Sequence, residues 1–450
     1  MFLDLKLRCR VGLCPSGYQG LTGQLAAVND PNGNLVCYAY DALGRVTGVN
    51  ANGTTCRHFY YDNSMGYSGS IPTGVSAPTY SLGRIVEAAT DNCASGTLQT
   101  DLWFSYDKNG REIDLWQKTP NSGVYYHSVA TFFENNVIKT IHIANPNKYT
   151  QTYGIDGEGR LNVLSSSQSS QTIVSSAAYN AASQPTNIAI GSGTDYDSYV
   201  YDPNTGRMTT WTFQVGTTPR QETGALSWNA NGTLGQLAIV DGFNSGGTQT
   251  CNFNPTNATG TGYDDLGRLI GVDCGSGGWG QTFSYDQYDN LTKAVISGRI
   301  GTTFNPGYNS ANNRFASAFG ATYDSNGDLT YDTFHNYEWD GFSKMKSVDR
   351  NGTNCAISGE CTVYDAFGRV VEIDSGATNT EILYTQLGKT AYLNGTALNY
   401  AYWPTPGGGT LLQPSGAFYY EHQRLARERS NIFRCQQRNN YRRQGIFSIR

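Results

Sequence analysis

A six-residue motif, Tyr-Asp-x-x-Gly-Arg, constrains the fold of this chain more than any other feature of its sequence. The Tyr suits the end of a half-buried strand, because aromatic residues favour pleated surfaces. The Asp carboxylate can accept a hydrogen bond from the backbone two residues on, and Gly supplies the positive φ of a tight hairpin. We interpret the motif as a strand-turn-strand hinge whose Arg begins the return strand. Its four intact copies are Tyr40-Asp41-Ala42-Leu43-Gly44-Arg45, Tyr106-Asp107-Lys108-Asn109-Gly110-Arg111, Tyr263-Asp264-Asp265-Leu266-Gly267-Arg268 and Tyr364-Asp365-Ala366-Phe367-Gly368-Arg369.

The spacing of the motif indicates one β-hairpin per repeat. Degenerate copies occur between the intact ones, and Tyr179 to Tyr201 and Tyr263 to Tyr285 are each 22 residues. Two strands of about eight residues with two turns fit this length. The longer interval from Tyr106 to Ile155 carries polar inserts, which we interpret as loops on one rim of the sheet.

Composition agrees with an all-β chain and excludes several classes of function. Charged residues are 15% of the 450 residues, against roughly a quarter in a typical globular protein, while Gly numbers 53 and Tyr 31. A net charge of −5 without a basic stripe gives no reason to expect a nucleic-acid partner. No apolar run reaches about 18 residues, so we expect no membrane span.

A stack of hairpins can bury its apolar face as a wound sheet or as the blades of a propeller. Propeller blades need about 40 residues each, so the shorter interval favours tandem hairpins in a spiralling β-sheet shell, partial and open, with a β-propeller-like fold as the alternative. We expect an irregular N-terminal segment over 1–29, the repeat sheet over 30–422 and a basic C-terminal tail over 423–450. Eight of the 31 Lys and Arg residues fall after Gln423, in a stretch without a hinge.

The ten cysteines are scattered and form no Cys-x-x-Cys metal motif. Cys355 and Cys361 bracket a polar loop between two strand segments, so a disulfide there is a hypothesis that requires an exported protein. The N-terminus lacks the uninterrupted apolar core of a signal peptide.

The hinge and its interval resemble the RHS/YD-repeat family. A shorter Asn-Gly-x-Leu element agrees with this resemblance, at Asn32-Gly33-Asn34-Leu35, Asn231-Gly232-Thr233-Leu234 and Asn326-Gly327-Asp328-Leu329. The resemblance implies a β-shell that in bacterial members encapsulates a C-terminal toxin, and in others binds carbohydrate or partner proteins at cell surfaces. Toxin-type members carry a motif similar to Asp-Pro-x-Gly-Arg-x-x-x-x-Asp-Pro that is associated with self-cleavage. This string is absent here, so no residue is assigned that reaction. Proteins that this chain resembles also continue after a Tyr-Tyr-x-His with an Asp-Trp-Leu-Gly-like segment that is missing here, so a truncated or out-of-frame tail is a hypothesis.

Motifs for chemistry are weak, and we assign no catalytic, cofactor-binding or metal-binding residue. Gly275-Ser276-Gly277-Gly278-Trp279-Gly280 matches a dinucleotide pattern, but a strand follows it instead of a helix. Gly66-Tyr67-Ser68-Gly69-Ser70 lacks the final Gly of a nucleophile elbow. The His residues are isolated, and the hinge Asp residues are too dispersed for a calcium loop. We expect the hinge Arg to lie over a Tyr of a neighbouring hairpin.

The leading hypothesis from the sequence is a non-enzymatic scaffold without a cofactor. In an extracellular or cell-surface protein it would enclose or present a C-terminal toxin or effector encoded beyond this chain, with an immunity protein as a further partner. The alternative is a module that binds surface glycans or a protein through exposed Tyr and Trp. A weaker alternative is a glycoside-active enzyme, which would require two carboxylates facing each other across a cleft.

Overall fold

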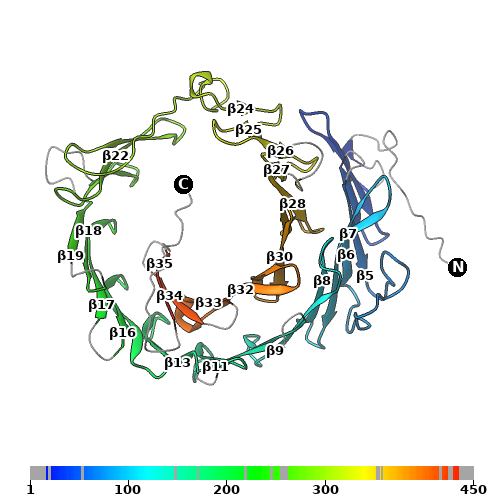
Figure 1. The fold of residues 1–450 in the computed structure, drawn as a ribbon, viewed down its shortest axis with the longest axis horizontal. Helices are drawn as coiled ribbons and strands as arrows, with labels where there is room; N and C mark the ends of the chain where they lie inside the picture. Colours follow the sequence, from blue (N-terminus) through cyan, green and yellow to red (C-terminus); the bar gives the residue numbers. More distant parts are fainter. Residues whose placement is uncertain are drawn as a thin grey trace. The chain divides into compact units, whose positions relative to one another are not determined.

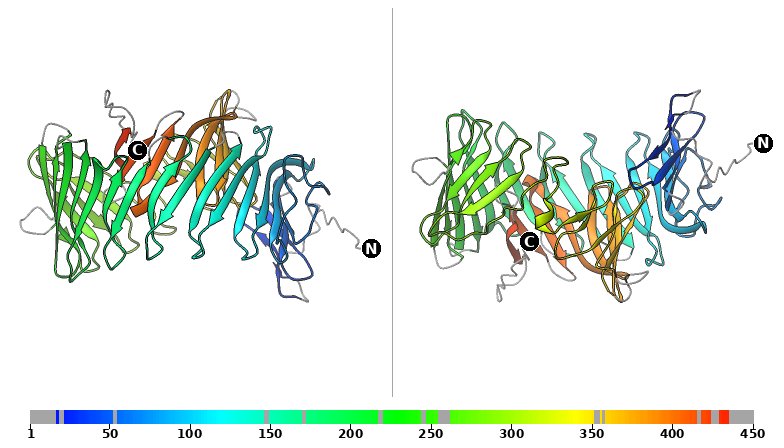
Figure 2. Two further views of the ribbon diagram at one scale, coloured as in Figure 1. Left: turned by 90° about the horizontal axis from the view of Figure 1, so that it is seen from below. Right: turned by 90° about the horizontal axis from the view of Figure 1, so that it is seen from above.

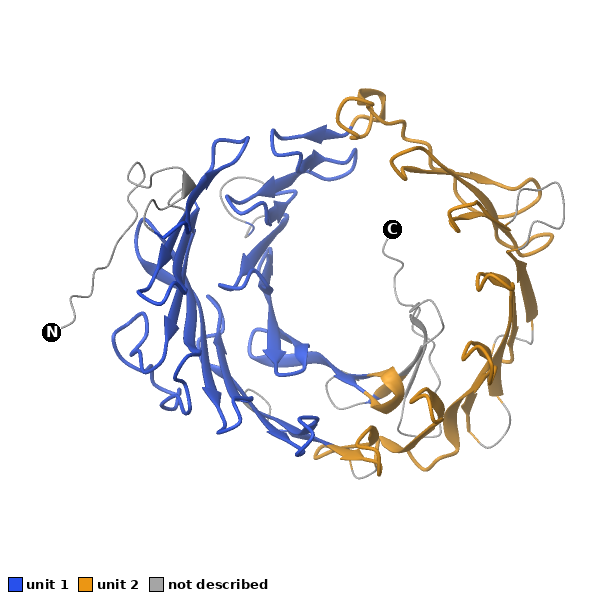
Figure 3. Cartoon of the chain, turned by 180° about the vertical axis from the view of Figure 1, so that it is seen from behind, with its two compact units in different colours: residues 1–152, 321–404, 411–418 blue, residues 153–320, 405–410, 419–450 orange. Residues whose placement is uncertain are grey.

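The computed structural model describes residues 17–18, 22–51, 55–145, 149–169, 172–216, 220–243, 247–253, 262–350, 355, 358–414, 418–423 and 429–434. The chain divides into two compact units (Figure 3). Unit 1 comprises Met1–Thr152, Ala321–Pro404 and Leu411–Phe418, and unit 2 comprises Tyr153–Gly320, Thr405–Thr410 and Tyr419–Arg450. Each unit is therefore built from segments far apart in the sequence.

The described elements are strands, apart from two short 3-10 turns, η1 (Ser317–Phe319) and η2 (Pro406–Gly408). The strands within residues 17–169 are β1 (Gly17–Tyr18), β2 (Leu25–Asn29), β3 (Leu35–Tyr40), β4 (Val46–Ala51), β5 (Thr55–Tyr61), β6 (Ile85–Asn92), β7 (Thr97–Tyr106), β8 (Glu112–Lys118), β9 (Tyr126–Phe132), β10 (Ile138–Asn145), β11 (Tyr149–Ile155) and β12 (Leu161–Ser166). Those that follow within residues 172–295 are β13 (Val174–Tyr179), β14 (Pro185–Ile190), β15 (Asp195–Tyr201), β16 (Met208–Val215), β17 (Arg220–Trp228), β18 (Leu234–Asp241), β19 (Gly247–Asn252), β20 (Gly262–Tyr263), β21 (Leu269–Asp273), β22 (Gly280–Tyr285) and β23 (Leu291–Val295).

The remaining strands lie in the last third of the chain. They are β24 (Thr322–Tyr323), β25 (Leu329–Tyr331), β26 (Tyr337–Trp339), β27 (Met345–Val348), β28 (Glu360–Tyr364), β29 (Val370–Ser375), β30 (Thr378–Thr385), β31 (Gly388–Asn394), β32 (Ala397–Pro404), β33 (Thr410–Pro414), β34 (Tyr419–Gln423) and β35 (Arg429–Arg434). None of the helices in the described residues has the length and apolarity needed to cross a lipid bilayer.

The strands pair antiparallel with their neighbours along the chain, as tandem hairpins require (Figures 1 and 2). They form a 23-stranded sheet of β1 to β23, a two-stranded sheet of β24 and β25, and a ten-stranded sheet of β26 to β35. The all-β hairpin-repeat fold predicted from the motif spacing is thus confirmed. The propeller alternative is wrong, because propeller blades are separate sheets of four strands and these strands pair in much longer series.

One expectation about the repeats needs correction. The interval from Tyr106 to Ile155 does not consist of rim loops, because it contains the four strands β8 to β11. Polar residues such as Gln117 and Ser128 lie within these strands and are buried, and they hydrogen-bond to residues of β30 and to Gln386, so their polarity does not reflect exposure in loops. Near the N-terminus, β1 and β2 lie inside the segment 1–29 that was expected to be irregular. In the basic tail, β35 pairs with β34, and residues 424–428 and 435–450 lie outside the described residues.

Unit 1 has two layers of strands (Figures 1 and 3). One layer contains β5 to β9 and the other contains β26 to β30. Phe367, in the turn before β29, lies 5.7 Å from the ring of Phe59 and 6.1 Å from the ring of Phe104. Ala366 joins the apolar cluster of Leu102, Phe104 and Leu115. The hinge turn of one layer therefore supplies apolar side chains to the core of the other.

Unit 2 buries its core along one face of the successive hairpins. Trp211, Phe213 and Leu226 form a cluster on β16 and β17. Gly224 is the cross-strand partner of Trp211, and a Cβ added at Gly224 would lie 2.1 Å from the indole. The missing side chain thus makes room for the large aromatic ring opposite it. The turn η2 packs on β12 to β14, where the N–H of Gly407 donates to the hydroxyl of Tyr179 at 3.0 Å.

Candidate functional site

The four intact hinges share one hydrogen-bond pattern centred on the Asp. In the first copy, Oδ1 of Asp41 accepts from the backbone N–H of Leu43 and of Arg45, both at 2.9 Å, and Oδ2 accepts from Nε of Arg45 at 2.6 Å. The corresponding Asp-to-Nε distances are 2.6 Å at Asp107, 2.7 Å at Asp264 and 2.6 Å at Asp365. The hinge Gly has φ between 76° and 80° in all four copies. The sequence predicted the hydrogen bond from the backbone N–H two residues after the Asp. The structure shows a further hydrogen bond, from the Arg side chain to the same Asp.

These hydrogen bonds determine the charge state of the hinge carboxylates. Burial by itself raises the pKa of Asp41, but hydrogen bonds from the backbone and guanidinium of Arg45 outweigh burial and lower the pKa below 3.8. The pKa values of Asp107 and Asp264 are lowered for the same reasons. The carboxylate therefore stays ionised at neutral pH and is fully engaged inside its own turn, which leaves it poorly suited to proton transfer with a substrate.

The hinge Arg connects each hairpin to the next. Arg45 donates to both oxygens of Asp62, at 3.2 and 2.7 Å, and its guanidinium lies 4.3 Å from the ring centre of Tyr61. Arg268 lies 4.5 Å from Tyr285, and Arg369 lies 4.4 Å from Tyr384. This is the cation–π contact expected from the sequence. In the remaining copy, Arg111 lies over Phe132 at 4.9 Å instead of a Tyr.

The hinge Tyr has a second role that sequence reasoning missed. Besides ending its strand, it donates its hydroxyl to a backbone carbonyl of the preceding repeat, at the start of that repeat's return strand. Tyr106 donates to Ile85 at 2.9 Å and Tyr364 donates to Met345 at 2.7 Å. The same bond joins Tyr61 to Val46 and Tyr285 to Leu269. A Tyr that recurs where Phe would pack equally well is the signal that could have revealed this bond.

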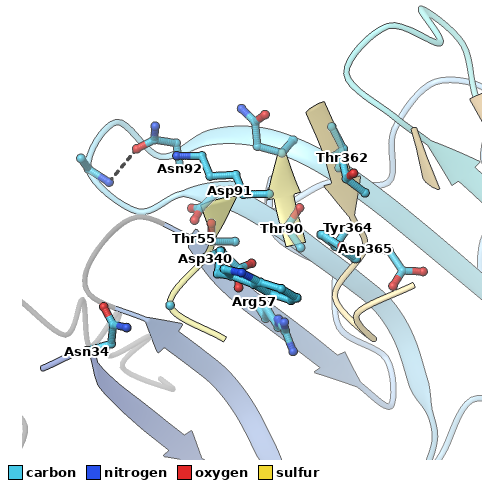
Figure 4. Close-up of a pocket in the computed structure, with 16 residues that line it drawn as sticks. Asn34, Thr55, Arg57, Thr90, Asp91, Asn92, Asp340, Thr362, Tyr364 and Asp365 are labelled. Carbon is cyan, nitrogen blue, oxygen red and sulfur yellow. Dashed lines mark hydrogen bonds between the residues drawn. The ribbon is translucent and has the colours of Figure 1, made fainter. Parts of the chain in front are cut away.

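A cavity of about 700 Å³ lies in unit 1 and is the candidate binding pocket (Figure 4). Most of the residues that line it have polar side chains, and they include Thr55 and Arg57 of β5, Thr90 and Asp91 of β6, and Thr362 and Tyr364 of β28. The guanidinium of Arg57 lies 3.7 Å from the ring centre of Phe342. Burial lowers the pKa of Arg57, and the carboxylates of Asp340 and Asp365 oppose this effect.

Three carboxylates line this cavity, but their partners argue against acid-base catalysis there. Asp365 holds its own hinge through Phe367 and Arg369. Asp340 accepts from two backbone N–H groups of its turn at 2.8 and 2.9 Å. Asp91 accepts from the hydroxyl of Tyr67 at 2.6 Å. Each carboxylate is thus engaged in local structure, and the cavity offers two cationic side chains, Arg57 and Lys346, and several hydroxyls to a ligand.

A buried carboxyl pair lies between β6 and β7 in unit 1. Glu87 and Asp101 are each only 1% exposed. Asp101 accepts from Tyr125 and, at 3.0 Å, from Nε1 of Trp103, while Glu87 accepts from the backbone N–H of Tyr67 at 2.5 Å. Burial, and then the charge of Asp101, raises the pKa of Glu87 to about 9, and burial also raises the pKa of Asp101. The pair therefore retains a proton at neutral pH and titrates as a unit.

A second carboxyl cluster lies where the turn after β8 meets β29 and β30. Glu372 and Glu381 are cross-strand partners, and both are completely buried. Asn121 donates to Glu372 from its backbone at 3.1 Å and its side chain at 2.8 Å, and Thr119 donates to Glu381. Burial is the largest cause that raises the pKa of Glu381, to about 8. Neither carboxyl pair lines the cavity, so neither provides the two facing carboxylates that a glycosidase needs.

Three disulfides join described cysteines of the chain. Cys355 and Cys361, the pair proposed from the sequence, have Cα atoms 5.6 Å apart. Cys56–Cys93 and Cys251–Cys274 were missed, because their sequence separations of 37 and 23 residues give no local signal. They become neighbours only once the strands pair. Cys9, Cys14 and Cys435 lie outside the described residues.

The other sequence candidates have structural explanations. The glycine-rich run Gly275 to Gly280 is a turn between β21 and β22, with no helix to hold a pyrophosphate. Gly66 lies in the segment between β5 and β6, which is not a strand-to-helix turn. Among the seven Trp residues, Trp103, Trp116, Trp211 and Trp403 are buried, and Trp279 is 36% exposed. Their burial argues against a sugar-stacking platform made of Trp.

A comparison with family models matches residues 21–63 to the RHS Repeat, a segment that contains the hinge Tyr40 to Arg45. Residues 21–63 thus carry an RHS repeat. The resemblance to the RHS/YD-repeat family is thereby confirmed for this segment. A search of curated proteins finds no match.

Solved structures share the fold of this chain. The crystal structure of TcdB2-TccC3-Cdc42 matches with a TM-score of 0.63 at 13% identity, and that of TcdB2-TccC3 with 0.61 at 14%. The crystal structure of TcdB2-TccC3 without its hypervariable C-terminal region matches with 0.61 at 13%. Each match covers 92% of this chain but only 24% of the other. At this identity the likeness shows a common fold, and the chain spans about a quarter of the length of these neighbours.

Proposed function

We propose that this chain is a non-enzymatic wall segment of an RHS-type β-shell, which encloses or presents a C-terminal effector that lies outside the chain. The observation that carries the proposal is the hinge itself. Its Asp, Gly and Arg determine a turn, and its Arg and Tyr join that turn to the neighbouring hairpin. Residues of catalytic type are thus used to extend a sheet. The hinge residues act structurally in this proposal.

The effector is inferred from the structural neighbours. One of them is described as lacking a hypervariable C-terminal region, which supports the proposal that a C-terminal segment accompanies this fold. A wall that excludes solvent and protease would keep such a segment inactive until release. An immunity protein that neutralises the effector is the further partner expected in the producing cell.

Export is part of the proposal. Disulfides are rare in cytosolic proteins and persist in oxidising compartments, and three are present in the described residues. We therefore propose an extracellular or cell-surface location. Fractionation of the producing cells should recover the chain outside the cytosol, and recovery from the cytosol alone would contradict this part.

Co-expression with the reading frames directly downstream tests the scaffold function. The tagged chain should retain one downstream product through affinity purification, and should slow its digestion by a broad-specificity protease by more than about tenfold. The matched control replaces the hinge Arg45 by Gln, which keeps a polar side chain but removes the positive charge and thus the ion pair with Asp62. If every downstream product is digested as fast with the chain as without it, the proposal that the chain encloses an effector is contradicted. A selective response on a glycan array in that case would favour the carbohydrate-binding alternative.

A further inference from the structure

One face of the β5–β6 hairpin brings four metal-ligating residues together. Cys56 and His58 are two residues apart on β5, so their side chains share a face of the sheet. Asp91 on β6 is the direct cross-strand partner of Cys56. Cys93, two residues after Asp91, is joined to Cys56 by a disulfide. Two short patterns, Cys-x-His and Asp-x-Cys, therefore meet on antiparallel strands.

The ligand atoms of this group are close enough to surround one ion. The Sγ of Cys56, a ring nitrogen of His58 and a carboxylate oxygen of Asp91 lie within 4.8 Å of one another. Nε2 of His58 is 3.3 Å from Oδ2 of Asp91. The Cα atoms of Cys56 and Cys93 are 5.2 Å apart, so the second sulfur lies at the same place. Two thiolates bound to a tetrahedral zinc at about 2.3 Å are separated by roughly 3.8 Å, which this backbone spacing permits.

We propose that Cys56, His58, Asp91 and Cys93 form a site for Zn²⁺ or a similar borderline-soft divalent cation when the Cys56–Cys93 disulfide is reduced. A dithiol reductant supplies two electrons and two protons, the S–S bond breaks, and the reductant becomes a disulfide. The ion then displaces the two thiol protons and binds two thiolates, one imidazole nitrogen and one carboxylate oxygen. In the reverse step a disulfide-containing oxidant accepts the two electrons of the thiolates and two protons from water and becomes a dithiol, while the ion is released and the S–S bond of the chain forms again.

The surroundings of the group suit a metal ligand set. The hydroxyl oxygen of Tyr67 lies 2.6 Å from Oδ2 of Asp91 and 2.8 Å from the carbonyl oxygen of Gly96, and donation of its one proton to Asp91 orients the carboxylate. The Tyr67 ring lies 5.1 Å from the His58 ring. Partners of this kind hold metal ligands in position. The His58 side chain remains 27% exposed, which gives an ion access from solvent.

The site would allow the same two strands to be cross-linked in two redox environments. In an oxidising compartment the disulfide joins the end of β6 to β5 across a loop of 37 residues. In a reducing cytosol, where thiols predominate, the ion would bridge the same residues. The chain could then fold before export with a metal bridge and function afterwards with a disulfide.

Cobalt binding tests the proposal directly, because Co²⁺ in a tetrahedral thiolate site gives visible bands and a sulfur-to-metal charge-transfer band. The chain reduced with a dithiol, which is then removed without air, should bind one Co²⁺ with these bands. Zn²⁺ should displace the Co²⁺, and the oxidised chain should show no such bands. A reduced chain without thiolate-cobalt bands would overturn the proposal.

Matched variants locate the site. His58→Asn and Asp91→Asn should each weaken Co²⁺ binding by more than about tenfold, since changes to residues that merely orient ligands already cost about 10- to 100-fold. His127→Asn is the control, because His127 also pairs with an Asp, Asp114, but no described Cys joins that pair in a common metal-ligand group. Unchanged binding by the His58 and Asp91 variants would show that the thiols bind cobalt without the site, and would overturn the proposal.

Alkylation of the reduced chain gives a second measure that does not need a ligand variant. Zn²⁺ should slow the reaction of iodoacetamide with Cys56 and Cys93 by about tenfold or more, as followed by peptide mass spectrometry. The cysteines of the other two disulfides, Cys251, Cys274, Cys355 and Cys361, are the internal controls and should react at unchanged rates. Equal protection of all six cysteines would contradict a specific site.

Discussion

Gln117 pairs its side-chain amide with the backbone of Tyr384 in the opposite layer of unit 1. Its Oε1 accepts from the N–H of Tyr384 at 3.0 Å, and its Nε2 donates to the carbonyl of Ile382 at 2.7 Å. Gln117 lies on β8 and is 1% exposed. One side chain thus satisfies a backbone donor and a backbone acceptor of β30, as a neighbouring strand would do.

Replacement of Gln117 by Leu should remove this contact and strongly destabilise the folded chain. The change leaves two backbone groups of β30 without their partner, and each unsatisfied buried group costs about 1–3 kcal/mol. We expect the free energy of unfolding, measured by urea denaturation, to fall by about 2–4 kcal/mol. Gln221→Leu is the control, because Gln221 lies on a strand and is exposed. Equal midpoints for the two variants would contradict the role of Gln117.

The hinge Arg should matter most where its Asp is most deeply buried. The Asp365 side chain is 0% exposed, whereas the Asp264 side chain is 22% exposed. Arg369→Ala leaves a buried carboxylate without its ion pair, a loss of about 3–5 kcal/mol. Arg268→Ala leaves a carboxylate that water can reach, so its effect on the thermal midpoint should be clearly smaller. Equal losses of thermal stability in the two variants, measured by calorimetry, would show that burial of the Asp does not determine how much the hinge Arg stabilises the fold.

Stability should be greatest in mildly acidic solution and should fall as the pH rises. Burial is the largest cause that raises the pKa of Asp374 to about 6, Glu112 to about 7, Glu381 to about 8 and Glu87 to about 9. Between the ordinary carboxyl values and these values, the folded chain holds protons that the unfolded chain has released. The free energy of unfolding therefore decreases with rising pH across this range.

Below about pH 4 the hinges should reverse this trend. Their Asp pKa values are lowered, so the stability they provide is present above 3.8 and is lost as the pH falls further. Urea midpoints measured from pH 3 to pH 9 should thus pass through a maximum near pH 5. Glu381→Gln should flatten the decline between about pH 5 and pH 8, and the exposed Glu158→Gln should not. A midpoint that rises steadily from pH 5 to pH 9 would exclude this explanation.

A side chain at Gly66 should destabilise the fold strongly, whereas a side chain at the nearby Gly69 should be tolerated at a smaller cost. Both have a left-handed φ, of 77° and 69°. A Cβ at Gly66 would lie 2.2 Å from Oε2 of Glu87 and 2.6 Å from the Trp103 ring, whereas a Cβ at Gly69 meets nothing within 4 Å. Gly69→Ala should cost about 1–2 kcal/mol from backbone strain, and Gly66→Ala should cost a further 1–3 kcal/mol from overpacking. Similar thermal midpoints for both variants would show that a Cβ at position 66 does not clash with Glu87 and Trp103.

The local chemistry of the turns made the hairpins predictable from sequence. An Asp that bonds to the backbone two residues on and a Gly with positive φ identify a turn wherever they occur together. Their spacing then indicated the two strands between successive turns, and Tyr106, for example, does end β7. The cation–π contact of Arg45 and Tyr61 was also accessible, because it follows from the stacking of adjacent repeats.

Contacts between residues far apart in the sequence could not be predicted in this way. Gln117 meets Ile382 across 265 residues, and nothing near either residue indicates the other. The carboxyl pair of Glu87 and Asp101 requires the register of β6 and β7, in which Asp101 lies opposite Ala89. A shift of one residue would turn one carboxyl to the other face. The polar residues of β8 to β11 resembled loop residues for the same reason, since their partners are distant in sequence.

The hinge bonds also determine how the hairpins of unit 2 respond to a pulling force. Arg268 and Tyr285 connect one repeat to the next, and the cross-strand pairs join immediate neighbours along the chain. Such a stack can come apart from one end without disturbing hairpins farther along. Tension on the chain would release segments of 22 residues, the distance from Tyr263 to Tyr285, each about 75 Å long when extended. The hairpins of unit 2 should therefore lengthen under tension in successive steps.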